Sequence, residues 1–516
     1  MPASAGRYYL TSPIYYVNAA PHIGHFYTTL ACDVLARFMR LDGREVRFVT
    51  GTDEHGQKIE AAAKTAGQDV QQYCDDIAEK FKSMSQTLGS THDDFIRTTE
   101  PRHIKAVQAL WQKLQEKGDI YLGSYAGWYA VRDEAFYGEN ELTLGPDGVK
   151  RAPSGAEVAW VEEPSYFFRL SAWQDKLMEF YTANPDFILP TSRRNEVLSF
   201  VKNGLTDLSI SRTSFKWGIP VPGDSNHVMY VWLDALTNYI SALGYPDQDN
   251  ALFKKFWPAD LHMVGKDILR FHAIYWPAFL MAADLPVPHR VYAHGWWTNE
   301  GQKMSKSLAN VIEPAALVAK YGLDAVRFFL LRELPFGNDG DFSHRAMIGR
   351  MNSELANDLG NLLQRVLAMV AKNCEGKTPQ PGKFTPEDET ILAQSKALYS
   401  SVKAAIERQQ FHEVLETIWV VIRAANGYVA AMAPWELRKT DPARMATVLY
   451  VAAEVARPIA FLLQPFMPEA TAKMLDILGV PAEHRTFAAI NQALVSGTSL
   501  PAPAPVFPRF VEEEVP

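Results

Sequence analysis

Two short segments carry side chains that could hold the phosphates of a nucleotide. His22-Ile23-Gly24-His25 places two imidazoles around a glycine, and Lys303-Met304-Ser305-Lys306-Ser307 places two ammonium groups among hydroxyls about 280 residues later. Free N–H groups at a helix start favour an anion, and positive charge stabilises a transferring phosphate. Alone, the first fits a surface pair or helix cap and the second a solvated basic turn. Together they favour one phosphate site.

A strand–helix–strand pattern is expected to position the first segment. Aromatic and β-branched residues predict a strand over Tyr8–Tyr16, followed by a helix over about Ile23–Leu41 and a second strand over Val46–Val49. This order is typical of a parallel, doubly wound sheet, in which ligands lie beyond the carboxyl ends of the strands. Both His22–His25 and Asp53 follow such ends.

The pattern changes twice further along the chain. Short aromatic runs and turns between about Gly118 and Gly223 predict an inserted module that contains β-strands. Strands and helices are then expected to alternate again, with strands over His227–Trp232, Leu261–Val264 and Arg290–Ala293 and helices around Thr237 and over Ile268–Phe279. From Ile312 onward, helical periodicity predicts a bundle of about 150 residues, followed by a Pro-rich acidic tail.

Length and composition bound the class of protein. With 516 residues the chain exceeds one hydrophobic core, and no apolar run is expected to span a membrane. The three cysteines, Cys32, Cys74 and Cys374, are too few and too dispersed for a disulfide framework or a zinc cluster. A net charge of −8 argues against bulk electrostatic binding to nucleic acid, although a local basic stripe remains open. We therefore expect a cytoplasmic protein without membrane contact.

The two phosphate-binding segments resemble the class I aminoacyl-tRNA synthetases, whose signatures HIGH and KMSKS both occur letter for letter. The residues around them are similar to the methionyl branch of this family. The matching segments are Pro13–Asn18, Thr50–Gly56, Val231–Ala235, Gly265–Ile268 and Ala433–Trp435. The resemblance covers essentially the whole chain. It implies that L-methionine attacks the α-phosphorus of ATP with Mg²⁺, and that the methionyl group then passes from the adenylate to the terminal adenosine of tRNA(Met).

The resemblance also implies roles for single residues. The developing charge on the phosphates would be stabilised by His22, His25, Lys303 and Lys306, and the nucleoside would be lined by Gly24, Gly265 and Asp267. The methionine pocket would comprise Ile14, Tyr16, Asp53, Trp232, Tyr239 and His272, with Asp53 pairing with the α-ammonium group. An aromatic pocket with a weak donor suits a flexible side chain with a soft sulfur. Leucine would leave that donor unpaired.

Recognition of tRNA is expected in the helical bundle. Single-stranded bases are bound by stacking on aromatic side chains and by hydrogen bonds to their edges. Trp435 matches the stacking tryptophan of the family, and Asn361 and Arg365, one helical turn apart, match its base-reading pair. Without the resemblance, a tryptophan after Pro434 would be interpreted as a packing residue at a helix start.

The fold implied by the resemblance is α/β: a Rossmann-like doubly wound parallel sheet with an inserted connective module, followed by an α-helical anticodon-binding bundle. The two halves of the catalytic domain are expected over residues 1–117 and 225–311, the second half including the KMSKS loop. The insertion would cover residues 118–224, a stem-contact connector residues 312–350, and the helical domain with its tail residues 351–516.

The sequence departs from the family pattern in the insertion. Many members carry a zinc knuckle with C-x-x-C pairs, but here Gly127-Trp128-Tyr129 is followed by Ala130-Val131-Arg132-Asp133, and the second half contains Ala152-Pro153-Ser154-Gly155. Without thiolates, a tetrahedral zinc site is not expected, so we predict no structural zinc. The C-terminal dimerising module of some members is also absent from this sequence, which favours a monomer.

Three alternative functions fit the sequence less well. Another class I synthetase is disfavoured because an insertion near 100 residues is too small for an editing module, and because the zinc ligands of the cysteinyl enzyme are missing. A small nucleotidylyltransferase shares a HIGH-like motif but needs no anticodon bundle. A non-catalytic tRNA-binding relative would have no use for a complete phosphate site.

Overall fold

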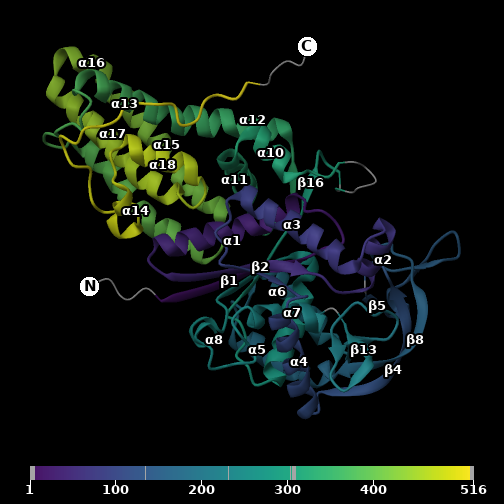
Figure 1. Ribbon diagram of the computed structural model, residues 1–516. Helices are drawn as coiled ribbons and strands as arrows, with labels where there is room; N and C mark the ends of the chain where they lie inside the picture. Colours follow the sequence, from purple (N-terminus) through teal and green to yellow (C-terminus); the bar gives the residue numbers. More distant parts are fainter. Residues whose placement is uncertain (1–5, 134, 231, 303, 305–309, 512–516) are drawn as a thin grey trace.

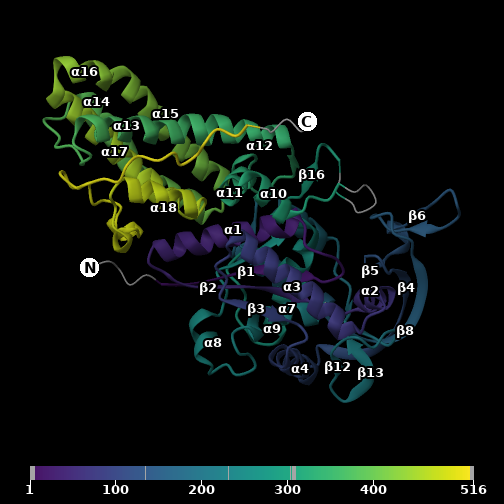
Figure 2. The same cartoon turned by 45° about the horizontal axis from the view of Figure 1, so that its top comes forward.

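A computed structural model describes residues 6–133, 135–230, 232–302, 304 and 310–511 of the chain. A central sheet with helices on both faces lies between an antiparallel β region, drawn in blue, and a helical bundle, drawn in green and yellow (Figure 1). The helical bundle packs on the side of the sheet layer where the purple helices α1 and α3 lie (Figures 1 and 2).

The central sheet has six parallel strands in the order β3-β2-β1-β14-β15-β9. They are β1 (Arg7–Tyr16), β2 (Glu45–Asp53), β3 (Asp94–Arg97), β14 (Leu261–Gly265), β15 (Val291–His294) and β9 (Ile188–Leu189). The chain proceeds outward from β1 on one side through β2 and β3, and on the other side through β14 and β15. The order therefore reverses at β1, and ligands bind at such switch points. The α/β fold expected from the sequence is confirmed.

Helix α1 (Ile23–Leu41) has the bounds that the sequence predicts. It packs on the sheet against β1 and β2 and, on its other side, against α3 (Val70–Leu88) and α11 (Leu323–Arg332). Nearly every α1 side chain from Phe26 to Met39 is buried. One hydrophobic core consequently continues from the sheet through α1 into the helical bundle, and a second core lies on the opposite face of the sheet.

The opposite face is covered by helices that follow the strands in sequence. Apart from α1 and α3, the α-helices that precede β15 in the chain are α2 (Gln57–Ala66), α4 (Pro101–Glu116), α5 (Gln174–Ala183), α6 (Thr191–Lys202), α7 (Trp232–Ser241), α8 (Ala251–Phe256) and α9 (Trp276–Ala282). The segment predicted as one helix over Ile268–Phe279 is a 3₁₀ turn at Lys266–Ile268, a π-helical turn at Phe271–Tyr275 and then α9.

The antiparallel β region is built around β4 (Ile120–Ala130) and β8 (Ala159–Phe168), which pair along almost their whole length. Flanking and neighbouring strands are β5 (Ala135–Tyr137), β10 (Leu208–Ser209), β6 (Thr143–Leu144), β7 (Lys150–Arg151), β11 (Ser211–Arg212), β12 (Pro220–Val221) and β13 (Asp224–Met229). One short strand from the segment expected to be the insertion, β9, instead joins the central sheet beside β15.

The strand expected over His227–Trp232 was wrong in its bounds and its sheet. The strand β13 ends at Met229 and pairs antiparallel with β11 and β12, and Trp232 begins α7. Alternation of apolar residues predicts a strand but not its partner. Here the partners are two short strands close by in sequence, which pair with β13 before the chain returns to the central sheet.

From Pro314 onward the described part of the chain is mainly helical, apart from β17 (Gly340–Phe342), which pairs with the earlier strand β16 (Trp297–Asn299). Its helices are α10 (Pro314–Tyr321), α11, α12 (His344–Arg350), a π-helical segment (Met351–Gly360), α13 (Asn361–Asn373), α14 (Pro386–Glu407), α15 (Phe411–Met432), α16 (Pro434–Thr440), α17 (Pro442–Leu463) and α18 (Pro468–Ile477). By length and composition α17 could cross a membrane, but 89% of its most apolar window is buried, as in the core helix of a bundle. The tail is docked, because Asn352 and the Phe510 backbone exchange hydrogen bonds of 3.0 and 2.8 Å.

Candidate functional site

The HIGH segment builds the start of α1. The imidazole Nδ1 of His22 accepts a hydrogen bond of 3.1 Å from the Gly24 N–H, and the His22 N–H donates one of 3.1 Å to Nδ1 of His25. The two ring centroids are 3.9 Å apart. A Cβ at position 24 would lie 2.9 Å from Cε1 of His22, so only glycine fits beneath that ring. The other N–H groups of the first turn are also bonded, Ile23 to the Ile312 carbonyl and His25 and Phe26 to the His22 carbonyl, so the helix start favours an anion through its dipole.

His25 is a neutral hydrogen-bond donor in this arrangement. Its ring meets the stacked rings of Tyr15 and Phe81 edge-on, at centroid distances of 4.9 and 5.1 Å. Burial, and then the neighbouring His22, lower the pKa of His25 well below its ordinary value. Since Nδ1 accepts from the His22 N–H, the remaining ring proton of the neutral form is on Nε2. His25 can therefore offer an N–H, rather than a full charge, to a phosphate oxygen.

Of the predicted nucleoside-binding residues, Gly24 lies in the first turn of α1, and Gly265 and Asp267 lie at the end of β14, beside the end of β15. Gly265 pairs in register with His294, and a Cβ on Gly265 would come within 2.5 Å of Oδ1 of Asp267. The exposed Asp267 carboxylate accepts a hydrogen bond of 3.1 Å from the indole of Trp296. The Gly265 backbone and the Asp267 carboxylate therefore lie close together at the end of β14, and a side chain at position 265 would displace that carboxylate.

Two residues that the sequence did not single out connect this edge to α1. The Thr28 hydroxyl lies 2.8 Å from Nε2 of His294, whose Nδ1–H donates to the Gly295 carbonyl at 2.8 Å. Burial lowers the pKa of His294, so the ring is neutral and its Nε2 accepts from Thr28. Thr28 lies one helical turn after Gly24, a spacing that could have indicated a role beside the HIGH segment.

The predicted methionine-binding residues fall into two groups. Tyr16 and Asp53 end two adjacent strands and pair with each other in register, and Ile14 lies opposite Gly51 in the same strand pair. They occupy the carboxyl edge of β1 and β2, as expected. Asp53 is buried, and Tyr16 is half-buried.

The second group surrounds a buried tyrosine–histidine pair. The Tyr239 hydroxyl is 2.6 Å from Nε2 of His272, and Nδ1 of His272 is 2.9 Å from the Ile268 carbonyl. Burial lowers the pKa of His272 to about 4, against a smaller opposing effect of the Ile268 hydrogen bond. The neutral ring donates to Ile268 and accepts from Tyr239. Trp232 stacks on Phe271 at 3.6 Å and meets His272 edge-on at 6.4 Å. Phe271 was not among the predicted site residues.

The predicted anticodon-reading residues belong to α13 and α16, and α16 lies at the end of the bundle remote from the sheet (Figure 1). Asn361 is exposed at the start of α13, and Trp435 is 41% exposed in the first turn of α16. Arg365 donates from Nη2 to Oδ1 of Asn426 on α15, at 3.2 Å. Among the described residues, the buried Nε of Arg365 finds no acceptor. Asn426 is held by donating to the carbonyls of Asp358 and Ile422, and no motif indicated it.

Two further predictions concern the KMSKS lysines and zinc. Lys303 and Lys306 lie outside the described residues. Within the described part of the chain, no group of three or more His, Cys, Asp or Glu side chains could hold a metal ion. The expectation of an insertion without zinc stays a prediction.

Comparisons with known proteins agree along the entire chain. A family model described as tRNA synthetases class I (M) matches residues 8–157 and 147–367, and one described as the anticodon binding domain of methionyl tRNA ligase matches residues 378–516. The methionine–tRNA ligase of Brucella suis is 57% identical over 512 residues, 99% of each chain, and that of Mycobacterium bovis is 52% identical over 514 residues, again 99% of each. The structure of Mycobacterium tuberculosis methionyl-tRNA synthetase in complex with methionyl-adenylate, at 52% identity, superposes with a TM-score of 0.96 over 98% of this chain and 100% of that one.

Proposed function

The chain belongs to the methionyl-tRNA synthetase family of class I, and from that premise we propose how its residues divide the work of the reaction. It is a methionine–tRNA ligase: methionine is activated with ATP to methionyl-adenylate and then transferred to tRNA. Methionine reacts with ATP at the carboxyl edge of β1, β2, β14 and β15. The end of the bundle that bears Trp435 reads the tRNA. The pairing of Tyr16 with Asp53, and of Gly265 with His294, at the switch point of the sheet supports this division most strongly.

In the activation step, a carboxylate oxygen of methionine bonds to the α-phosphorus, and the bond from that phosphorus to the bridging oxygen of pyrophosphate breaks. Nε2–H of His25 donates to a phosphate oxygen at the positive end of the α1 dipole, while His22 holds the first turn of α1 in shape. Lys303 and Lys306 supply the full positive charges. Mg²⁺, when bound together with ATP, would neutralise part of the charge on the phosphates.

Methionine is held at both of its ends. The Asp53 carboxylate pairs with the α-ammonium group, next to Tyr16 and the Ile14 backbone. The thioether side chain lies against Trp232, Tyr239 and His272. Because the Tyr239 hydroxyl already has a fixed acceptor at 2.6 Å, its orientation is set before the substrate binds.

The anticodon of tRNA(Met) is read on the bundle. The exposed face of Trp435 offers a stacking surface for an unpaired base, and Asn361 offers its amide to a base edge. Arg365 carries a buried donor without an acceptor among the described residues, which a base edge would satisfy. The division into residues 1–117, 118–224, 225–311, 312–350 and 351–516 places the first-step residues and the anticodon residues in different domains. A cytoplasmic monomer without structural zinc fits these assignments.

Methionine-dependent exchange of pyrophosphate into ATP tests the activation site. With each of the twenty amino acids in turn, methionine should give the dominant rate, and a signal for methionine no higher than the others would refute the specificity. Lys306→Ala should lower the rate of adenylate formation far more than the affinity for methionine. The matched control is Lys254→Ala, which removes an exposed lysine of α8 and should change neither.

Transfer of methionine to tRNA tests the bundle separately. Trp435→Ala should weaken tRNA charging while sparing pyrophosphate exchange. Loss of both activities together would contradict the proposed division. Light scattering at several concentrations and elemental analysis of protein purified without chelator test the monomer and the absence of zinc.

A further inference from the structure

Asp234 is a carboxylate without exposed surface that joins two histidines from distant parts of the chain. Its Oδ2 lies 2.6 Å from Nδ1 of His55, and its Oδ1 lies 2.7 Å from Nε2 of His103 on α4. On the other side of the His103 ring, Nδ1 lies within hydrogen-bond distance of the Ser241 hydroxyl, at 2.9 Å. The segment around Asp234 and the segment around His55 each contain proposed methionine-binding residues. Neither of these two side chains, however, has a role in the reaction described so far.

The carboxylate is charged despite its burial. Burial acts to raise the pKa of Asp234, but the charge of His55 and the hydrogen bonds from His103 and His55 outweigh it and lower the pKa to about 2. A buried carboxylate with two such donors is a strong and directional link, since charged hydrogen bonds are shorter and stronger than neutral ones. Removing one partner of such a link leaves an unpaired charge in the interior.

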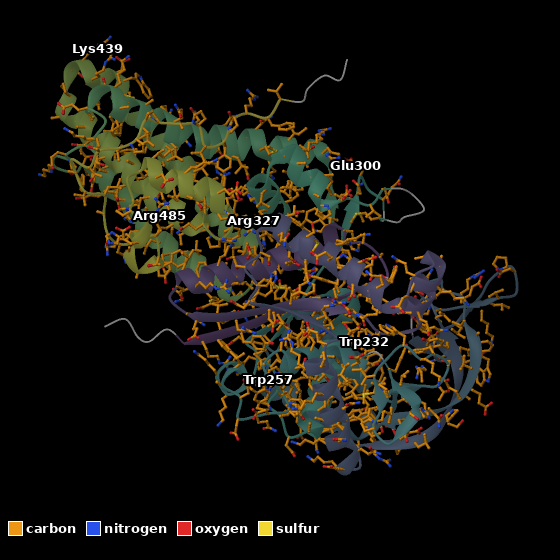
Figure 3. All side chains as sticks on the ribbon, viewed as in Figure 1. Trp232, Trp257, Glu300, Arg327, Lys439 and Arg485 are labelled. Carbon is orange, nitrogen blue, oxygen red and sulfur yellow. The ribbon has the colours of Figure 1, made fainter. Side chains whose placement is uncertain are left out.

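The link joins the two groups of methionine-binding residues. His55 comes two residues after Asp53, and Asp234 lies in the first turn of α7, two residues after Trp232 and five before Tyr239. The contact therefore fixes the loop of the ammonium partner against the helix of the side-chain pocket, across 179 residues of sequence. Figure 3 labels Trp232 on the side of the sheet opposite the bundle, where α7 lies.

The same loop is held from its other sides, so that Asp53 has little freedom. The Glu54 carboxylate accepts two hydrogen bonds from Arg97, at 2.6 and 3.0 Å. The indole of Trp217 donates to the Glu54 carbonyl at 2.5 Å and meets the His55 ring edge-on at 5.7 Å. Of these contacts, only the one through Asp234 reaches α7.

We propose that Asp234 is a positioning residue for methionine: by holding His55 it sets the distance between the Asp53 carboxylate and the aromatic pocket on α7, and so determines the affinity for the amino acid. The proposal rests on the methionine site proposed above. Since ATP is held by other elements, at the start of α1 and the ends of β14 and β15, loss of the link should act on methionine binding and not on ATP binding.

The experiment is a comparison of Michaelis constants in pyrophosphate exchange for wild type, Asp234→Asn and His55→Gln. The asparagine keeps the shape but removes the charge and one of the two acceptors. We expect the KM for methionine to rise tenfold or more in both variants, with the KM for ATP and kcat within threefold of wild type. The two variants remove the link from opposite ends, so His55→Gln decides if Asp234→Asn does not fold.

A matched control separates positioning from general loosening. Asp388 in α14 is also a carboxylate without exposed surface and with a pKa lowered to about 2, and it is bound by Arg444 and Tyr428 within the bundle. Asp388→Asn should lower thermal stability and leave the KM for methionine unchanged. An unchanged KM for methionine in His55→Gln, an equal rise in the KM for ATP, or an equal rise in Asp388→Asn would each overturn the proposal. Wild-type protein without methionine-dependent exchange would instead refute the proposed function itself.

Discussion

Asp33 on α1 and Arg327 on α11 form an ion pair of 2.8 Å in which neither side chain has any exposed surface. The Arg327 guanidinium also donates to the carbonyls of Phe466, Pro465 and Leu88, at 2.9, 2.7 and 3.1 Å. One side chain thus joins the helix of the HIGH segment, the end of α3 and the turn between α17 and α18. Figure 3 labels Arg327 where the green bundle meets purple α1.

Arg327→Met should destabilise the protein strongly, because it leaves Asp33 charged and buried with one cation fewer. Arg37 still donates to Asp33 at 2.8 Å, so we expect a loss near the lower end of the ~3–5 kcal/mol typical of a broken buried pair. Urea unfolding followed by tryptophan fluorescence measures it. Lys254→Ala, which breaks an ion pair with side chains 62% and 89% exposed, is the control and should change little. A similar small effect of both changes would contradict the role assigned to Arg327.

The free energy of unfolding should depend on pH in part through Asp324, in the first turn of α11. Burial raises the pKa of its carboxyl to about 6, even though Oδ2 accepts from the Ala470 N–H at 2.5 Å. A folded-state pKa above the unfolded value favours folding at low pH, and this contribution is lost as the pH rises through 6. Asp324→Asn keeps the acceptor and removes the charge, so the variant should be the more stable protein at pH 8.

The difference between variant and wild type isolates Asp324 from all other titrating groups. From pH 5 to pH 8, the advantage of Asp324→Asn in free energy of unfolding should grow by about 1–1.5 kcal/mol, since one pKa unit corresponds to ~1.4 kcal/mol. Urea unfolding of both proteins at the two pH values measures it. A difference that stays constant with pH, or that shrinks as the pH rises, would exclude the raised pKa.

The sequence was most informative where function depends on residues close together in the chain. The pattern around β1 and α1 predicted the bounds of that helix and placed Asp53 at a strand end, because local periodicity and the parallel strand order together determine both. The HIGH segment could be recognised as a helix start since its capping contacts join residues two and three positions apart.

The rest depends on tertiary packing between distant segments. Asp234 and His103 are 131 residues apart, and Arg327 and Phe466 are 139 apart; nothing in either local pattern indicates the contact. The same holds for Asn426, which touches Arg365 only because α13 and α15 pack side by side. The neutral state of His25 likewise follows from its burial, which lowers its pKa and which the HIGH segment alone does not indicate.

Asn426→Ala should weaken the recognition of tRNA without touching the activation site. The change removes the acceptor that orients Arg365 and leaves its guanidinium less well placed, so we expect the KM for tRNA in charging to rise about tenfold, which is the effect of roughly one hydrogen bond to a charged group. Pyrophosphate exchange should stay at the wild-type level. Asn373→Ala is the control, because Asn373 lies on α13 as well but bonds only to the Met369 carbonyl of its own helix. Equal effects of the two changes on charging would count against a specific role for Asn426.

Thr28→Val should impair ATP use selectively. Valine has nearly the same shape but cannot donate to His294, so Nε2 of this buried ring, next to Gly265, loses its partner. An unsatisfied buried acceptor costs about 1–3 kcal/mol, and part of that cost should appear as a KM for ATP raised roughly five- to tenfold. The KM for methionine should stay within twofold, because Tyr239 and His272 do not contact Thr28.

Thr471→Val in α18 serves as the matched control, since it removes an equally buried hydroxyl that donates to the Met467 carbonyl. If both variants raised the KM for ATP alike, or if Thr28→Val changed the two Michaelis constants in parallel, the hydroxyl of Thr28 would have no specific part in shaping the nucleoside edge.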